Sequence, residues 1–196
     1  MSKLILASAS PRRQQLLTQV GVSFTIEPAD IDERPTSGEA PRDYVLRMAY
    51  EKAQHVSWKR PTAFVLGADT IVTIDDEILG KPQDLAEARR MLRGLSGRTH
   101  TVMTGLALLH HDRGIVQQDT VSTAVRFRHL AEHDIETYVA TAKPLDKAGA
   151  YAIQDSARAF VEAFDGCYTN VVGLPVQRTV DLMRAAGVEV PYGTGA

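Results

Sequence analysis

The sequence of 196 residues contains a single cysteine, Cys167, and no hydrophobic run long enough to cross a membrane. One cysteine excludes an intramolecular disulfide and a cysteine-rich zinc site, so a reducing, cytoplasmic setting is expected. The apolar stretch at the start of the chain is too short for a secretory signal, and it is expected to form a first strand instead.

An excess of charge of either sign is also missing. The 22 Lys and Arg residues nearly balance 24 Asp and Glu residues, which leaves a net charge of −2. Binding to DNA or RNA needs clustered positive charge, so it is not expected as the main role. The composition, 44% hydrophobic with no repeat or linker, predicts one globular domain over residues 1–196.

Three common functional motifs are absent as well. The chain has no GxxxxGK[ST] and no GxGxxG, which weighs against a P-loop protein and a dinucleotide-binding fold. Its six histidines show no HExxH-type spacing, so a dedicated zinc site is not expected.

The patterns that are present mix strands and helices. Strands are expected over residues 4–7, 63–67, 101–109, 121–128, 160–164 and 167–172, the last two as a hairpin around Asp165 and Gly166. Another hairpin is expected over 71–79, turning at Asp75 and Asp76. Helices are expected after Ser10, from about Pro41, and over 84–95, 132–140 and the stretch after Pro175. Without strict βαβ alternation, these elements predict an α/β (α+β) fold with a mixed sheet.

The first helix begins in an unusual way. Ser10 is a good N-cap and Pro11 suits the first helical position, yet Arg12 and Arg13 follow at the positive end of the helix dipole. Two arginines there are favourable when an anion binds, and the guanidinium fork matches phosphate oxygens. The alternative is two solvated surface arginines.

A lysine occupies the apolar face of the second helix. Lys52 follows Met48 by four residues and Val45 by seven, so it shares their side of the helix. Such a lysine either extends to the edge of the core or borders a cleft that holds an anion.

Two carboxylates, Asp69 and Glu33, are candidate functional residues as well. Asp69 comes directly after the strand expected at 63–67, and Glu33 lies in the polar stretch between the first two helices. With the turn at residues 75–76, Thr70 faces Lys81, so Asp69 and Lys81 are expected as diagonal neighbours, either around a ligand or as an ion pair. Acids combined with phosphate-facing cations favour Mg²⁺ or Mn²⁺.

Taken together, several motifs resemble the Maf nucleotide pyrophosphatases in order and spacing. They are LASASPRR (6–13), EKA (51–53), LGADT (66–70), GKP (80–82), LSG (95–97), DKAGAYAIQ (146–154) and NVVGLP (170–175). The resemblance implies hydrolysis of a nucleoside triphosphate between the α and β phosphates, a divalent cation, and a cytoplasmic homodimer. It also implies a fold similar to the inosine triphosphate pyrophosphatases, an elongated mixed sheet with a central cleft.

Within that family, the branch acting on dTTP and UTP resembles this chain at three positions, Arg12, Thr70 and Gln154. The resemblance implies Asp69 as the base, Glu33 and Asp69 as metal ligands, and Ser10, Arg13, Lys52 and Lys81 as the triphosphate-binding residues. The family often has a glycine-rich loop after Gln154, whereas residues 155–160 here read DSARAF, a departure that bears on substrate range. The alternatives are a pyrophosphatase for 7-methyl-GTP or modified nucleotides, and a slow nucleotide-binding regulator of cell division.

Overall fold

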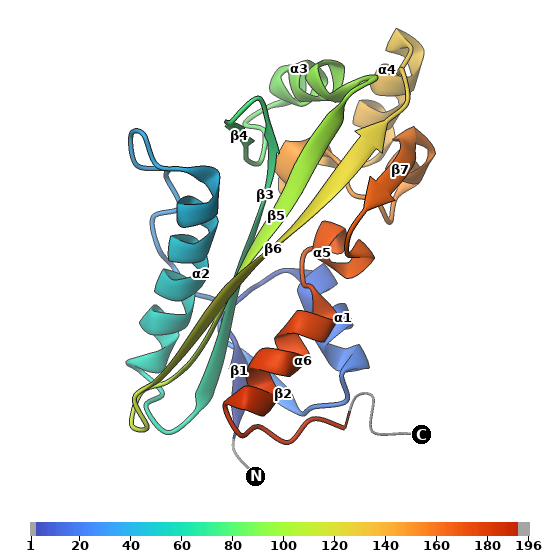
Figure 1. Ribbon diagram of the computed structural model, residues 1–196. Helices are drawn as coiled ribbons and strands as arrows, with labels where there is room; N and C mark the ends of the chain where they lie inside the picture. Colours follow the sequence, from blue (N-terminus) through green and yellow to red (C-terminus); the bar gives the residue numbers. More distant parts are fainter. Residues whose placement is uncertain (1–2, 192–196) are drawn as a thin grey trace. The chain divides into compact units, whose positions relative to one another are not determined.

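The computed structural model describes residues 3–191 and shows an α/β fold built on a mixed sheet (Figure 1). Within the described residues the sheet has seven strands in the order β2-β1-β3-β5-β6-β7, with β4 paired to β3. β1 is parallel to β2 and β3, whereas β4 and β7 are antiparallel to their partners. The mixed sheet predicted from the sequence is confirmed.

The chain divides into two compact units, each packed mainly within itself. Residues 1–69, 104–121 and 173–196 form unit 1, and residues 70–103 and 122–172 form unit 2. The long strands β3, β5 and β6 contribute residues to both units. The single domain over 1–196 stays a prediction.

Unit 1 holds the parallel strand pairs β1–β2 and β1–β3. Its elements are β1 (Leu4–Leu6), α1 (Pro11–Gln19), β2 (Phe24–Ile26), α2 (Pro41–Ser57), α6 (Val176–Ala185) and parts of β3 (Phe64–Ile74), β5 (Thr99–His110) and β6 (Ile115–Phe127). Figure 1 shows α2 on one side of these strands and α1 with α6 on the other.

Unit 2 holds the remaining parts of β3, β5 and β6 together with the middle of the chain. Its other elements are β4 (Glu77–Leu79), α3 (Leu85–Leu95), α4 (Glu132–Thr141), β7 (Val161–Asp165), α5 (Tyr168–Val172) and three 3₁₀ turns at Pro144–Asp146, Ala148–Ala150 and Ser156–Phe160.

The predicted helix starts are confirmed in detail. Ser10 caps α1, its hydroxyl accepting from the Arg13 amide at 3.5 Å, with Pro11 as the first helical residue. Asp84 caps α3 by accepting from the amide of Glu87 at 2.7 Å. Side chains therefore satisfy amides that the first turns of these helices leave without a backbone partner.

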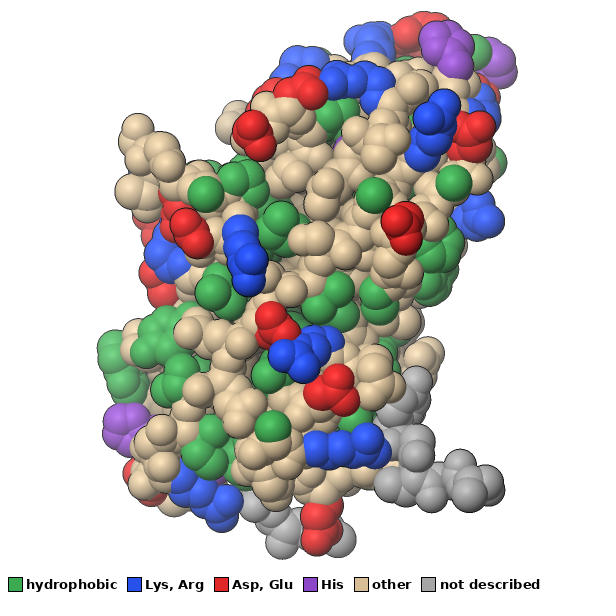
Figure 2. Space-filling model, in the orientation of Figure 1, with side chains coloured by type: hydrophobic (Ala, Val, Ile, Leu, Met, Phe, Trp, Pro, Cys, Tyr) green, Lys and Arg blue, Asp and Glu red, His purple; other side chains and the backbone are tan. Residues whose placement is uncertain are grey.

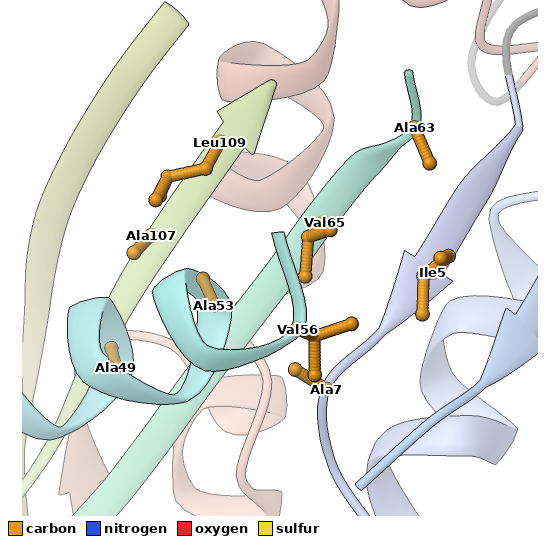
Figure 3. Close-up of a cluster of buried hydrophobic side chains, with 9 residues drawn as sticks. All are labelled: Ile5, Ala7, Ala49, Ala53, Val56, Ala63, Val65, Ala107 and Leu109. Carbon is orange, nitrogen blue, oxygen red and sulfur yellow. The ribbon is translucent and has the colours of Figure 1, made fainter. Parts of the chain in front are cut away.

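Helix α2 packs closely on the sheet of unit 1. A cluster of buried side chains, five of them alanine, fills the contact, and Figure 3 shows them on α2, β1, β3 and β5: Ile5, Ala7, Ala49, Ala53, Val56, Ala63, Val65, Ala107 and Leu109. A Cβ on Gly67 would lie 2.1 Å from the carbonyl oxygen of Ala49, and a Cβ on Gly105 would lie 2.2 Å from that of Val45. Glycine at these two strand positions therefore sets how near the helix comes.

An aromatic cluster fills the interior of unit 2. The ring of Phe127 lies edge-on to His100 and to Tyr151, each with ring centres 4.8 Å apart. Nε2 of the buried His100 lies 2.7 Å from the hydroxyl of Tyr151. Burial lowers the pKa of His100 to about 4, so the ring is neutral at pH 7.

The hairpin predicted at Asp75 and Asp76 is confirmed with its register. Ile74 pairs with Glu77 across the two-residue loop, whose members have φ angles of +50° and +62°, as a type I′ turn requires. Strands β3, β5 and β6 are longer than predicted, and β5 extends to His110, one residue beyond the predicted strand over 101–109.

The hairpin predicted at Asp165 and Gly166 is wrong. Residues 161–165 form β7, which pairs with β6, but the chain then enters helix α5 rather than a second strand. The buried Asn170 donates from Nδ2 to Val102 O at 3.0 Å and to Thr123 Oγ1 at 2.9 Å. These distant hydrogen bonds favour the helical turn over the strand that a short apolar run suggests.

Candidate functional site

The cationic start of α1 folds back on the chain rather than extending into solvent. Arg13 is half-buried: its Nε donates to Gly173 O at 2.9 Å and its Nη1 to Ser8 Oγ at 3.1 Å. The guanidinium is thereby fixed beside the first-turn amides that Ser10 caps, which suits an anion.

Arg13 also lies within electrostatic reach of two carboxylates. Burial lowers the pKa of Arg13, while the negative charges of Asp69 and Glu33 raise it and the neighbouring Arg12 lowers it. All four residues belong to unit 1, so these electrostatic interactions lie within one compact unit.

Lys52 joins the two carboxylates. Its side chain is only 7% exposed, and Nζ lies 2.6 Å from Asp69 Oδ1 and 2.8 Å from Glu33 Oε1. The position on the apolar face of α2, beside Met48, is confirmed. Lys52 is thus paired with carboxylates on the side of α2 that faces β3, and its role beside a bound anion stays a prediction.

Asp69 lies inside strand β3, and not after it as the sequence pattern predicts, because the strand extends to Ile74. Alternate strand residues share a face, so Val65, Gly67 and Asp69 all point toward α2. Glycine at position 67 lets the helix approach, and Asp69 then meets Lys52 two residues further along the strand. A carboxylate is tolerated in a buried strand here because it is paired.

Glu33 is positioned by its backbone as well as by its charge. Its carbonyl oxygen accepts from the hydroxyl of Tyr44 at 2.7 Å, and Tyr44 is a buried residue of α2. Burial, together with the nearby charges of Asp69 and Glu33, raises the pKa of the Tyr44 hydroxyl, which therefore remains a donor. The Glu33 side chain itself is 46% exposed, so it faces solvent on one side of Lys52.

The two carboxylates that contact Lys52 are oxygen ligands of the kind that a hard divalent cation prefers. Two carboxylates converge on a single point, and Mg²⁺ sites often use one or two carboxylates with phosphate oxygens and water. Among residues 3–191, no group of three or more His, Cys, Asp and Glu side chains is placed to hold a metal ion. The protein therefore supplies at most part of such a coordination sphere.

The remaining predicted residues belong to unit 2 and are more exposed. Lys81 is exposed and follows β4, which ends at Leu79, so the predicted pairing of Lys81 with Thr70 lies beyond the three residue pairs of the hairpin. Asp69 forms an ion pair with Lys52, and its proximity to Lys81 stays a prediction. Thr70 is half-buried, and Gln154 is exposed.

Three residues of the site were not predicted: Ser8, Tyr44 and Gly173. Tyr44 could have been found, because it precedes Met48 by four residues and Lys52 by eight on one face of α2. Ser8 lies two residues before the N-cap, in the polar segment that the sequence predicts to bind an anion. The carbonyl of Gly173 carries no sequence signal, since its contact with Arg13 joins opposite ends of the chain.

The fold and this cluster define an α/β protein in which a cationic helix N-terminus lies beside a lysine-bridged pair of carboxylates. The chain belongs to the Maf family: the family described as Maf-like protein matches residues 3–186.

Similar curated proteins share about half of their residues with this chain. It is 50% identical to a dTTP/UTP pyrophosphatase of Geotalea uraniireducens over 186 residues, covering 95% of this chain and 96% of that protein. It is 51% identical to a dTTP/UTP pyrophosphatase of Shewanella oneidensis over 195 residues, which cover 94% of this chain and 98% of that protein.

Among solved structures, a nucleoside-triphosphatase / dITP/XTP pyrophosphatase of Mycobacterium abscessus matches with a TM-score of 0.44. It is 17% identical, and the match covers 65% of this chain and 75% of that one.

Proposed function

We propose that this protein hydrolyses dTTP and UTP to the nucleoside monophosphate and pyrophosphate. The observation that carries the proposal is the placement of Lys52 between Asp69 and Glu33, with Arg13 in electrostatic reach. Relatives about 50% identical over nearly the whole chain are named dTTP/UTP pyrophosphatase, which supports the same substrates here.

In the reaction, water attacks the α-phosphorus and the bond from that phosphorus to the bridging oxygen of the β-phosphate breaks. Asp69 accepts a proton from the attacking water, and Lys52, whose Nζ lies 2.6 Å from Asp69 Oδ1, fixes the position of this carboxylate. The products are a monophosphate and pyrophosphate, so the negative charge that develops on the leaving group must be stabilised.

The cations of the site provide that stabilisation. Arg13 and Lys52 bind the triphosphate oxygens, together with Ser10 and the first-turn amides of α1. We assign Lys81 the same role from the family resemblance. When substrate enters, Lys52 exchanges part of its contact with the carboxylates for phosphate oxygens.

Glu33 and Asp69 would hold a divalent cation, Mg²⁺ or Mn²⁺, whose other ligands come from the triphosphate and water. When bound, it supplies Lewis-acid charge stabilisation at the phosphate oxygens. The half-exposed Glu33 can turn toward such an ion without breaking the Tyr44 contact, which its backbone makes.

Substrate choice is assigned to Arg12, Thr70 and Gln154. The amide of the exposed Gln154 offers both a donor and an acceptor, as the edge of a uracil or thymine ring requires. The neutral Thr70 hydroxyl does not attract the cationic ring of 7-methyl-GTP. A preference for 7-methyl-GTP or modified pyrimidines is the alternative for an enzyme of the same chemistry.

The family resemblance also supports a homodimer and a cytoplasmic setting, which we retain as parts of the proposal. No helix within residues 3–191 is long and apolar enough to span a bilayer. On the face shown in Figure 2, Lys and Arg side chains lie among Asp and Glu rather than in a continuous basic surface.

The test is the release of pyrophosphate from a panel of nucleotides, with kcat/KM measured for dTTP, UTP, CTP, GTP and 7-methyl-GTP in the presence of Mg²⁺ or Mn²⁺. Reaction in ¹⁸O-labelled water should place the label in the monophosphate, since attack is at the α-phosphorus. Release of inorganic phosphate, or label in pyrophosphate, contradicts the proposal. Binding without turnover would instead support a nucleotide-binding regulator.

A further inference from the structure

Lys147 is the second deeply buried lysine of the chain, after Lys52, and it lies away from the carboxylate pair, in unit 2. The residue is 5% exposed. Its Nζ donates to Ala142 O at 2.9 Å, to Lys143 O at 2.7 Å and to Asp146 Oδ1 at 2.8 Å. All three ammonium protons are therefore used, two of them on carbonyls at the end of helix α4.

The same ammonium reaches the residue that follows Gln154. Asp155 Oδ2 lies 3.5 Å from Lys147 Nζ, so the lysine connects the C-terminal end of α4, the start of the loop at Asp146 and its end at Asp155. The loop over residues 146–155 thus begins and ends at one buried positive charge.

The loop between these anchors has little regular structure to hold it. Gly149 and Ala150 both have positive φ angles, +64° and +65°, within a short 3₁₀ turn. An alanine in this conformation is strained, and it persists only where surrounding contacts impose it. A pocket of about 560 Å³, lined largely by polar residues, lies over Lys147, so hydrophobic packing does not hold the loop on that side.

The opposite side of the loop is fixed independently. The amide of Gly149 donates to Gly80 O at 3.0 Å, and a Cβ at position 149 would lie 2.8 Å from Val72 Cγ2. The amide of Ala152 donates to the hydroxyl of the buried Tyr138 at 3.2 Å. The chain is therefore held up to Ala152 without Lys147. The amide of Asp155 donates to Ala152 O at 3.1 Å and closes the turn through Ile153 and Gln154, while the Asp155 side chain is directed to Lys147.

We infer that Lys147 is a positioning residue: its buried ammonium holds Asp155 and so fixes the direction in which Gln154 meets the nucleobase. This inference rests on the proposed function, in which Gln154 reads the pyrimidine edge. A lysine suits the position, because three tetrahedrally arranged protons match two carbonyls and the Asp146 carboxylate, and the planar fork of arginine does not. The same positive charge attracts the Asp155 carboxylate at 3.5 Å.

The test uses Lys147→Met, which keeps the length of the side chain and removes its donors, and Lys143→Met, which removes an exposed positive charge from the same segment as a matched control. UTP and CTP are compared, because they differ in the ring edge assigned to Gln154. We expect Lys147→Met to reduce the UTP:CTP ratio of kcat/KM at least about fivefold, mainly through KM for UTP, and Lys143→Met to leave it unchanged.

A double-mutant cycle with Gln154→Ala separates positioning from general structural support. If Lys147 acts through Gln154, adding Lys147→Met to Gln154→Ala changes the UTP:CTP ratio no further. Additive effects, or an equal loss for UTP and CTP in the single variant, overturn the inference. Where Lys147→Met does not fold, Asp155→Asn breaks the same connection at an exposed residue and is expected to shift the ratio in the same direction.

A second measurement does not depend on turnover. Amide hydrogen exchange should be faster over residues 153–156 in Lys147→Met, while the Gly149 amide, held by Gly80, keeps its protection. Unchanged exchange over 153–156 overturns the inference even if the enzyme is inactive. Absence of pyrophosphate release by the wild-type protein counts against the proposed function alone.

Discussion

Lys52 Nζ lies 2.6 Å from Asp69 Oδ1, and this contact joins helix α2 to strand β3 at a point where both are buried. Glu33 Oε1 lies 2.8 Å from the same nitrogen. One positive charge thus holds together the proposed base and the proposed metal ligand. The roles of Lys52 and of the Asp69 carboxylate can be tested separately by substitution.

Replacing the Asp69 carboxylate should remove catalysis and spare the fold. We expect Asp69→Asn to lower kcat for UTP at least ~10²-fold, on the scale of a lost general base, because an amide cannot accept the proton of water. Asp76→Asn, in the exposed hairpin turn, is the matched control and should retain full activity. Normal turnover by Asp69→Asn at equal metal and substrate supply removes the assignment.

Removing the Lys52 ammonium should change metal binding in the absence of nucleotide. In Lys52→Met, Glu33 and Asp69 repel one another across an apolar side chain, so we expect Mn²⁺ to bind at least about tenfold more tightly than in the wild type. Isothermal titration without nucleotide measures this, and kcat/KM for UTP should fall in the same variant. Equal Mn²⁺ affinity in both proteins would show that these two carboxylates do not share the metal.

Metal removal provides a complementary prediction for the wild-type protein. A chelator should abolish pyrophosphate release, since the chain supplies two converging carboxylates that need a cation to approach a triphosphate. Its effect on the unfolding temperature without nucleotide should be small, because Lys52 already forms an ion pair with each of the two carboxylates. A large chelator-induced drop in that temperature would indicate a structural metal elsewhere.

The close approach of α2 to the sheet predicts a large effect of one methyl group. In Gly67→Ala the new Cβ meets the Ala49 carbonyl, so the helix must shift, and we expect a loss of about 1–3 kcal/mol in the free energy of unfolding. Activity should fall as well, because Lys52 moves with the helix. Urea unfolding and kcat/KM check the two effects.

Gly94→Ala is the control for that substitution. Gly94 lies in α3 and a Cβ there meets nothing within 4 Å. Helix propensity then favours alanine by about 1 kcal/mol, so this variant should be more stable than the wild type. Similar destabilisation of both variants would contradict the steric argument.

The buried His100 predicts a specific loss of stability in mild acid. Its pKa is about 4 in the folded protein and near 6.5 when unfolded, so the unfolded state binds the extra proton between these values. Stability therefore falls as the pH drops from about 6.5 toward 4, by up to about 3 kcal/mol from this residue. His100→Gln should remove that contribution to the slope, as chemical unfolding at several pH values would show. If the dependence of unfolding free energy on pH is the same in the variant, other titratable groups cause the loss of stability in acid.

The local parts of this structure were predictable because their determinants are close in the sequence. Ser10 and Pro11 start α1, Asp75 and Asp76 form the turn before β4, and Lys52 shares a helix face with Met48. Caps, turn conformations and helical spacing depend on residues a few positions apart, so the pattern alone is sufficient.

The wrong predictions fall where distant residues decide the outcome. The chain after Gly166 forms a helix because Asn170 bonds to Val102 and Thr123, which lie in other strands. Asp69 lies inside β3, whereas the sequence pattern places it after the strand, because pairing with distant strands extends β3 to Ile74. The resemblance to the Maf family proposed residues for the site without placing one against another, and their roles stay predictions.

The sequence by itself determined where helices begin, which faces are apolar and which side chains carry charge, since these follow from neighbouring residues. Only the tertiary structure decided which charges meet. Gly67 and Gly105 bring α2 against the sheet, and that approach places Lys52 between Asp69 and Glu33. Contacts between residues far apart in the chain depend on how whole elements pack, which no local pattern contains.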